Sequence, residues 1–268
     1  MALYVLLVWM ALVGSVPEVE DKDEVPPPAP PAKDRVDAIL TAVEKSGETL
    51  RDVRCKVEYH EDDQLNLVET KRSGRVLFLK TDANPLFLIE FSRTVCDDIV
   101  STKRIWYLFD GLSLVEAREK TKHIVERQVV AEGEKVDFFD LQTAPFPMPF
   151  GQKKGQIERH FEVKLVPPAK GDPEGTDHLV CTPRQGTRME RKYAKLEFYV
   201  LKDIHLPRKI VATLPGGQGV TSAVFPDLSK SSINSGLKAK DFAEPPQWKK
   251  EGYTRDVEPF DADNPTGP

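Results

Sequence analysis

The stretch Lys103-Arg-Ile-Trp-Tyr-Leu-Phe109, followed by Asp110-Gly111 and then Leu112-Ser-Leu-Val-Glu-Ala-Arg-Glu-Lys120, decides the fold class of this chain. Asp-Gly between two apolar runs is a strong hairpin signal, because a type I′ turn needs a positive φ at both central residues. The stretch therefore predicts two antiparallel strands joined by a two-residue turn.

Both faces of this hairpin are apolar near its turn. Pairing across Asp110-Gly111 places Phe109 opposite Leu112 and Tyr107 opposite Leu114 on one face. A hairpin in a sheet with one solvated face is apolar on one side only, so something other than water must cover each face here. Either a helix or second sheet completes a plain core, or a curved sheet encloses a cavity. The second face carries Trp106 with Val115 and Leu108 with Ser113.

The composition is that of a protein that buries a substantial core. The chain has 268 residues, of which 30% are charged and 40% hydrophobic, with a net charge of −5. This length allows one large domain or two small ones. Proteins that bind nucleic acid normally carry a patch of basic residues. The net negative charge of this chain gives no reason to expect nucleic acid as a partner.

The N-terminus has the pattern of an export signal. Residues 3–14 form a compact apolar run, and the small residues Gly14 and Ser15 follow it. The run is short for a transmembrane helix, which needs about 20 residues. We expect a signal peptide over residues 1–15, or a membrane anchor if it is not cleaved. The acidic, Pro-rich residues 16–33 are expected to form an extended linker.

The chain from 34 to 253 is expected to fold as one domain, followed by a disordered tail over 254–268 that has little apolar content. Asp34 offers an N-cap, and apolar residues at helical spacing predict a helix that extends to Gly47. Period-two alternation and turn signals then predict an antiparallel meander, with a turn at Ser73-Gly74. The expected strands are 53–60, 65–72, 74–80, 86–91, 103–109, 112–120, 122–130, 157–166, 177–182, 193–201, 206–214, 219–225, 231–234 and 237–242.

An apolar segment with several prolines interrupts the predicted strands. Residues 136–150 include prolines at 145, 147 and 149, which exclude regular structure at its end. It nevertheless carries several large apolar side chains and must lie on something apolar. It is either a plug in the core or a lid over a pocket mouth. The lid candidates are Phe138, Phe139 and Phe146.

Signatures of enzymes and metal sites are absent from the sequence. It has no GxSxG, HExxH, P-loop, GxGxxG or paired CxxC. The cluster His60-Glu61-Asp62-Asp63 lies at a strand end and lacks a partner at a recognised ligand spacing. Arg188, Arg191 and Lys192 are interpreted as part of a solvated basic face. We expect no enzyme activity, no metal and no cofactor. Three cysteines, Cys55, Cys96 and Cys181, are expected to remain unpaired in strand-like segments.

The order of these elements resembles the lipoprotein-carrier family of bacterial envelopes, the LolA/LolB-like group, which also includes the sensor domain of an envelope-stress anti-sigma regulator. The resemblance rests on the export signal and the helix after it, together with several strand and turn patterns. These are Ser73-Gly-Arg-Val-Leu-Phe-Leu79, Asn84-Pro85, Arg104-Ile-Trp-Tyr-Leu-Phe-Asp-Gly111, Tyr193-Ala-Lys-Leu-Glu-Phe-Tyr-Val200, Leu206-Pro-Arg-Lys-Ile210, Val220-Thr-Ser-Ala-Val-Phe225 and Leu237-Lys-Ala-Lys-Asp-Phe242 before Pro245-Pro246.

The resemblance implies a mainly β fold with few helices. In that family a strongly curved antiparallel sheet forms an incomplete β-barrel, and helices act as a lid over an apolar cavity that accepts acyl chains. Two features differ from the carriers: Leu86–Phe91 lacks their arginine after the preceding turn, and Pro145–Pro149 replaces a short helical lid.

Two functions follow as hypotheses. In the first, an exported, periplasmic or envelope-associated domain holds a lipid or a lipidated protein by its acyl chains. In the second, the same fold has a filled core and works as an interaction or sensor module with a transient protein partner in the envelope. A deep open cavity favours the first hypothesis. Its candidate lining residues are Tyr59, Phe78, Trp106, Tyr107, Phe109, Phe198 and Ile210, although alternation alone does not decide between Trp106 and Tyr107.

Overall fold

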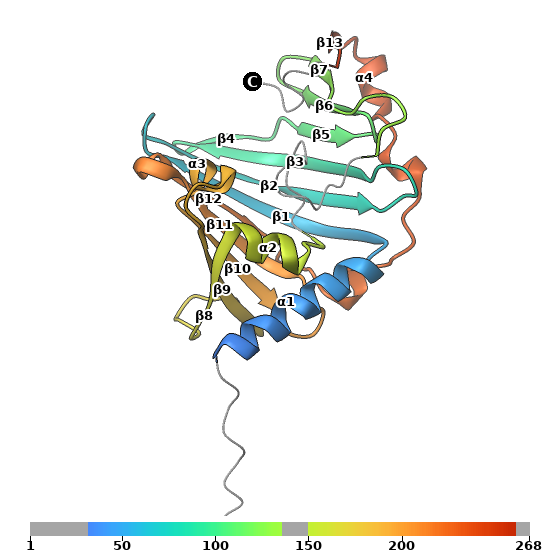
Figure 1. The fold of residues 1–268 in the computed structure, drawn as a ribbon. Coiled ribbons are helices and arrows are strands. Elements are labelled where there is room, and N and C mark those ends of the chain that lie inside the picture. The colour runs from blue at the N-terminus through green and yellow to red at the C-terminus, as the bar shows by residue number, and fades with distance from the viewer. Residues whose placement is uncertain (1–31, 136–149, 261–268) are drawn as a thin grey trace, which may run out of the picture. The chain divides into compact units, whose positions relative to one another are not determined.

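The computed structural model of this protein describes residues 32–135 and 150–260 (Figure 1). The strands of these residues form one 13-stranded sheet, which is antiparallel except for a single parallel pair. The sheet is strongly curved and does not close, because its path ends at two different strands. The predicted fold class, a mainly β domain with an incomplete barrel and an N-terminal helix, is confirmed.

The first half of the domain is one helix and a meander. Helix α1 spans Ala32–Thr49, and the strands are β1 (Asp52–Asp63), β2 (Val68–Leu79), β3 (Leu86–Cys96), β4 (Ile99–Ser101), β5 (Ile105–Phe109), β6 (Ser113–Arg118) and β7 (His123–Gln128).

The second half is another meander with short helices. It comprises α2 (Lys154–His160), β8 (Phe161–Val166), β9 (Thr176–Pro183), α3 (Arg188–Lys192), β10 (Lys195–Leu201), β11 (Pro207–Thr213) and β12 (Gly219–Val224), then α4 (Pro246–Lys250) and β13 (Thr254–Glu258). Short 3₁₀ turns lie at Pro215–Gly217, Lys230–Ser232 and Ala239–Phe242.

The two meanders join where β1 pairs with β12. The strand order is β13-β7-β6-β5-β3-β2-β1-β12-β11-β10-β9-β8, with β4 beside β3. At the junction Tyr59 lies opposite Ala223. Because successive strands of each meander pair with one another, each half forms from local pairs, whereas β1 with β12 and β7 with β13 join strands far apart in the sequence.

One face of the sheet, here called the inner face, carries the helices α1, α2 and α3. Figure 1 shows α1 and α2 in front of the strands of the second half. Leu40 and Val43 on the apolar stripe of α1 pack in one cluster with residues of β8–β10 such as Leu179. The inner face of the first half carries the residues Tyr59, Phe91 and Tyr107.

The opposite face, here called the outer face, is closed over β5 and β6 by the C-terminal segment. Trp106 and Leu108 lie in one buried cluster with Leu237, Phe242 and Trp248. The rings of Trp106 and Trp248 meet edge to face, with centroids 5.7 Å apart. The outer apolar face of the hairpin is thus covered by protein.

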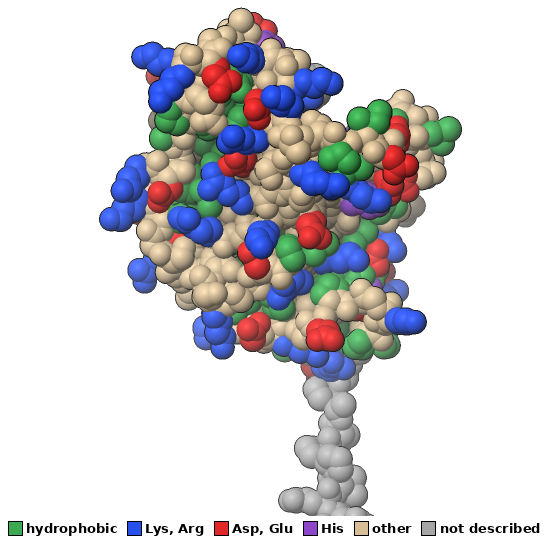
Figure 2. All heavy atoms as spheres, turned by 180° about the vertical axis from the view of Figure 1, so that it is seen from behind, with side chains coloured by type: hydrophobic (Ala, Val, Ile, Leu, Met, Phe, Trp, Pro, Cys, Tyr) green, Lys and Arg blue, Asp and Glu red, His purple; other side chains and the backbone are tan. Residues whose placement is uncertain are grey.

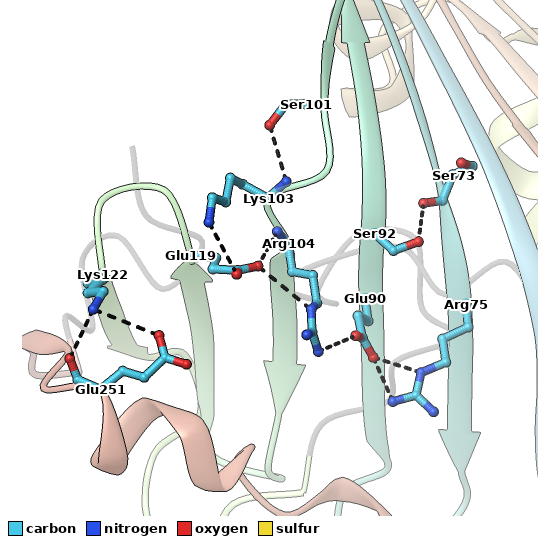
Figure 3. A network of polar contacts seen from close by, with 10 residues as sticks. All are labelled: Ser73, Arg75, Glu90, Ser92, Ser101, Lys103, Arg104, Glu119, Lys122 and Glu251. Atoms are coloured by element: carbon cyan, nitrogen blue, oxygen red, sulfur yellow. Dashed lines mark hydrogen bonds and ion pairs between the residues drawn. The ribbon is translucent and has the colours of Figure 1, made fainter.

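Beyond this cluster the outer face is polar. Figure 3 shows a chain of ion pairs that crosses β2, β3 and the start of β5. Arg75 Nη2 lies 2.6 Å from Glu90 Oε2, and Arg104 Nη1 lies 3.6 Å from Glu90 Oε1. Figure 2, which views the molecule from behind, shows Lys and Arg side chains interspersed with Asp and Glu over this face. These contacts suit a face in water.

The register of the central hairpin differs from the prediction by two residues. Phe109 pairs with Leu114 instead of Leu112, because the turn consists of Gly111-Leu112 and not Asp110-Gly111. The carboxylate of Asp110 accepts hydrogen bonds from the backbone N–H groups of Leu112 and Ser113, which fixes this turn. Only Gly111 has a positive φ, as in a type II′ turn. A shift of two leaves every side chain on its predicted face.

No turn forms at the predicted position Ser73-Gly74: β2 runs through it without a break, opposite a β-bulge on β3. Ser73 pairs with Arg93 and Gly74 with Phe91, so Ser92 is the extra residue. A Cβ at Gly74 would lie 1.8 Å from the carbonyl oxygen of Glu90. Glycine therefore marks a close approach of two strands here, which sequence alone does not distinguish from a turn.

Three further predictions were wrong. Residues 157–160 belong to α2 and not to a strand, and 3₁₀ turns replace strands at 231–234 and 237–242, apart from one bridge between Val53 and Ile233. Thr254–Glu258, placed in the disordered tail, forms β13 beside β7. Five residues of this strand pair with β7, Arg255 makes an ion pair with Glu126, and the side chains of His123 and Asp256 share a hydrogen bond.

Candidate functional site

A cavity of about 440 Å³ lies on the inner face of the sheet. Its volume falls within the range of about 300–1,000 Å³ that is usual for ligand pockets. Its apolar and aromatic lining in the first meander is Val57, Tyr59, Val76, Phe87, Ile89, Phe91, Tyr107 and Leu114. From the second half come Met189, Tyr193, Leu196, Phe198, Ile210, Ala212, Ala223 and Phe225.

Strand alternation builds this lining. Val57 and Tyr59 point inward from β1 because residues two apart share a face. Across the β1–β12 junction, Ala223 lies between Tyr59 and Ile210 in the register. A small side chain at that central position leaves space that a larger one would fill.

An aromatic row forms one wall of the cavity. The rings of Tyr59 and Phe91 lie 6.2 Å apart, and those of Phe91 and Tyr107 lie 6.3 Å apart in an edge-to-face arrangement. Burial raises the pKa of both Tyr59 and Tyr107, and nearby Arg72 partly opposes this shift. Both phenols therefore stay neutral at physiological pH, and the wall presents apolar ring faces with polar edges.

Few polar groups among the described residues line the cavity. Gln152 is buried, and Lys192 and Tyr193 come from the end of α3. Burial, and secondarily the charge of Arg188, lowers the pKa of Lys192. Thr221 and Ser222 contribute from β12. Most of the cavity lining is thus apolar, and these few residues supply its polar groups.

The structure places the seven candidate lining residues in three environments. Tyr59, Tyr107, Phe198 and Ile210 line the cavity. Phe78 and Phe109 are fully buried in the inner-face core and do not line it. Trp106 lies on the outer face against Trp248. The neighbours Trp106 and Tyr107 thus divide as alternation requires, with Tyr107 inside. A ligand-contacting role for the four lining residues remains a prediction.

The lid candidates Phe138, Phe139 and Phe146 lie outside the described residues, as do the predicted signal peptide and residues 16–31 of the predicted linker. The next residue with a described position, Phe150, is fully buried and packs against Phe225, with ring centroids 5.2 Å apart. The chain therefore emerges from this segment into the inner-face core.

Helix α3 was missed by sequence reasoning. Its basic residues Arg188, Arg191 and Lys192 are exposed, as interpreted. Met189 between them is buried, however, and lines the cavity together with Lys192 and Tyr193. The available signal was the spacing of Met189 and Tyr193, since residues four apart share one face of a helix.

Consecutive positions of the cluster His60–Asp63 point to opposite faces, so the four side chains do not converge. His60 pairs with Glu69 at 2.8 Å, while Asp63 accepts hydrogen bonds from the turn residues Leu65 and Asn66. In residues 32–135 and 150–260, no group of three or more His, Cys, Asp or Glu is arranged to hold a metal ion. Across those same ranges, every helix is too short or too polar for a membrane span.

Comparisons with known proteins find likeness in structure only. No protein-family model and no curated protein sequence matches the chain. An uncharacterized conserved protein from Thermus thermophilus matches with a TM-score of 0.48 and 16% identity, over 84% of this chain and 99% of that one.

Two further solved structures are similar. In the MucA/MucB complex of Pseudomonas aeruginosa, the match has a TM-score of 0.45 and 11% identity, over 79% of this chain and 61% of that one. A LolA superfamily protein from Nitrosomonas europaea matches with a TM-score of 0.31 and 12% identity, over 78% of this chain and 97% of that one. LolA superfamily proteins, the group that the sequence pattern resembles, are thus among the structural neighbours.

Proposed function

We propose that this protein is an exported, non-enzymatic domain that binds a lipid or a lipidated protein by holding acyl chains in the inner-face cavity. The observation that carries the proposal is the cavity of about 440 Å³ with its almost wholly apolar lining. Each methylene group moved from water into such surroundings gains about 0.8 kcal/mol, so binding needs no catalytic group. The apolar run over residues 3–14 supports export.

The test measures what the full-length protein carries and what it binds. Protein purified without detergent is examined by native mass spectrometry before and after extraction with organic solvent, and then titrated with a fluorescent fatty acid. We expect an extractable mass of lipid size and saturable binding. An apo mass before extraction together with no binding of the fluorescent fatty acid would contradict the proposal.

A cavity-filling variant makes the test specific. Ala223→Trp puts a large side chain at the centre of the lining, between Tyr59 and Ile210, and is expected to abolish fatty-acid binding. The matched control is Ser231→Trp, which introduces the same side chain at an exposed position outside the lining. Equal binding by both variants would place the fatty acid elsewhere.

A second candidate is a protein-interaction module of the same fold. Large apolar side chains are exposed at the tip of the β1–β2 hairpin and on β4: Leu65 is 70% exposed, Leu67 81% and Ile99 75%. The replacements Leu65→Ser, Leu67→Ser and Ile99→Ser together would weaken partner capture from an envelope extract without changing fatty-acid binding. The cavity itself favours the first candidate, since an interaction module needs none.

A further inference from the structure

The inner face changes character along its strands. The cavity is apolar around Val57 and Val76, and the aromatic row follows at Tyr59. Beyond the row, toward the β1–β2 turn, the inner-facing positions become polar. In the register Tyr59 lies opposite Arg72, and Arg72 lies opposite Thr94, so three side chains stand side by side across β1, β2 and β3. The strands thus present an apolar surface with a polar end.

Arg72 is the cation at that end. Its guanidinium carbon lies 5.7 Å from the centroid of the Tyr59 ring, which itself lines the cavity. The Arg72 side chain is 24% exposed, and its Nη1 makes an ion pair of 3.5 Å with Glu61 Oε2. The effect of Arg72 on the pKa of both Tyr59 and Tyr107 shows that its charge acts on both ends of the aromatic row.

Two buried polar atoms here lack a hydrogen-bond partner among residues 32–135 and 150–260. They are Nε of Arg72 and Oγ1 of Thr94, on paired residues of neighbouring strands. Buried polar groups are nearly always satisfied, and an unsatisfied donor or acceptor costs stability. The pair lies next to Tyr59, which lines the cavity, so its unused hydrogen-bonding capacity is close to the apolar lining.

The β-bulge puts Thr94 in this place. With regular pairing after Phe91, Arg93 would point inward and Thr94 outward. The extra residue Ser92 reverses this alternation, so Arg93 pairs with Ser73 on the outer face and Thr94 faces inward beside Arg72. Gly74 permits the close strand approach at the bulge. The backbone irregularity thus leaves one arginine and one hydroxyl at the polar end instead of two arginines.

We propose that Arg72 and Thr94 bind the anionic headgroup of an amphiphile whose acyl chain lies in the cavity. This inference rests on the proposed function and names the ligand class, a chain ending in a carboxylate or a phosphate. The planar guanidinium donates two parallel hydrogen bonds to either group, and the Thr94 hydroxyl donates a third. Glu61 competes for the same guanidinium, and its side chain is 39% exposed, so it can turn toward water when an anionic head arrives.

The test compares three amphiphiles with the same chain: laurate, dodecyl phosphate and the uncharged dodecanol. Each is titrated into the full-length protein, with displacement of an uncharged fluorescent probe as the readout. We expect the wild type to prefer the two anions over dodecanol by about tenfold, the factor that a free-energy difference of about 1.4 kcal/mol represents. A stronger preference for laurate indicates a fatty acid as the natural class, and a stronger preference for dodecyl phosphate indicates a phospholipid.

Four variants separate charge from shape. Arg72→Gln is expected to remove the preference for anions while dodecanol still binds, and Thr94→Val to reduce it by a smaller factor. Glu61→Gln is expected to strengthen the binding of both anions, because their competitor loses its charge. Arg93→Gln is the matched control, since it removes an arginine next to Thr94 from the outer face, and it is expected to keep the preference.

The outcomes distinguish this inference from the function on which it rests. If dodecanol binds and Arg72→Gln leaves the ratio of anion to alcohol affinity unchanged, the headgroup site is wrong and the acyl cavity stands. The same holds if Arg93→Gln lowers that ratio as much as Arg72→Gln. If none of the three amphiphiles displaces the probe from the wild type, the proposed function itself fails.

Discussion

The two faces of the same strands are covered in different ways. On the outer face of β5, Trp106 is 1% exposed and packs against Trp248, which the C-terminal segment brings over the sheet. On the inner face the next residue, Tyr107, is only half-buried and lines a cavity of about 440 Å³. Of these two adjacent residues, Trp106 thus belongs to a packed core and Tyr107 to the wall of a cavity.

The difference comes from what packs against each face. The outer cluster receives Leu237, Phe242 and Trp248 from one continuous stretch of chain that follows β12. The helices of the inner face pack mainly on the second half, where Leu40 of α1 and Met189 of α3 share a cluster. The strands of the first half are therefore closed on one side and face a cavity on the other. Apolar alternation in a sequence shows that a face is covered but not how fully.

The largest effect that this comparison predicts is at Trp106. Trp106→Ala is expected to lower the free energy of unfolding by about 3–5 kcal/mol, because it opens a space in a filled cluster. Tyr107→Ala, one residue away, is expected to cost clearly less stability and to weaken fatty-acid binding instead. Denaturant unfolding of both variants, with titration of the fluorescent fatty acid, measures the two effects. Equal losses of stability would mean that the two faces are equally well packed.

The next largest expected effect is on the free energy of unfolding, when a small residue on each face is replaced by a larger one. Ala117 is fully buried in the outer cluster, opposite Trp106. Ala117→Leu is expected to destabilise the protein by about 1–3 kcal/mol through overpacking. Ala223→Leu enters the cavity and is expected to change the free energy of unfolding by no more than about 0.5 kcal/mol. Thermal unfolding of the two variants decides this, and a large destabilisation by Ala223→Leu would show that the cavity has no room.

Sequence reasoning was sufficient where a pattern is local. The alternation around Tyr59 predicted β1, and the apolar run at Ile105–Phe109 predicted β5. Because side chains alternate along a strand, Trp106 and Tyr107 were placed on opposite faces. The resemblance supplied the curvature of the sheet. The register of the hairpin was predicted wrongly, because Asp110-Gly111 and Gly111-Leu112 are both acceptable turns, and the choice depends on hydrogen bonds of the Asp110 carboxylate.

The candidate site was predicted only in part, for reasons of packing. Phe78 and Phe109 point to the same face of the sheet as the lining residues, but they are packed in the core beside the cavity. Which inner-facing residues reach the cavity depends on tertiary contacts, which alternation does not show. Met189 was missed because a five-residue helix gives almost no periodic signal. Arg72 was missed because its inward direction depends on the pairing of β2 with β1, and Thr94 because it follows a bulge that has no sequence signature except Gly74 and Ser92.

The smallest predicted effect concerns the three cysteines, which are free. Cys55 belongs to the inner-face core beside the cavity, and Cys181 to the cluster under α1. Burial raises the pKa of each thiol from 9.0 to about 12, with a smaller contribution from Asp227 at Cys55. Since the thiolate is the reactive form, neither thiol is expected to react with a thiol reagent at pH 8, whereas Cys96 is only half-buried and is expected to react.

Titration of the native protein should therefore detect one fast thiol, and titration in denaturant should detect all three. Cys96→Ser should remove the fast reaction without changing the slow ones. This result bears directly on the inner face, because a cavity whose base was open to water would expose Cys55. If Cys55 reacted as fast as Cys96 while Cys181 stayed protected, the inner-face core would be a solvated cleft. Protection of Cys55 equal to that of Cys181 means instead that the cavity has a packed base, which is what the proposed acyl-chain site requires.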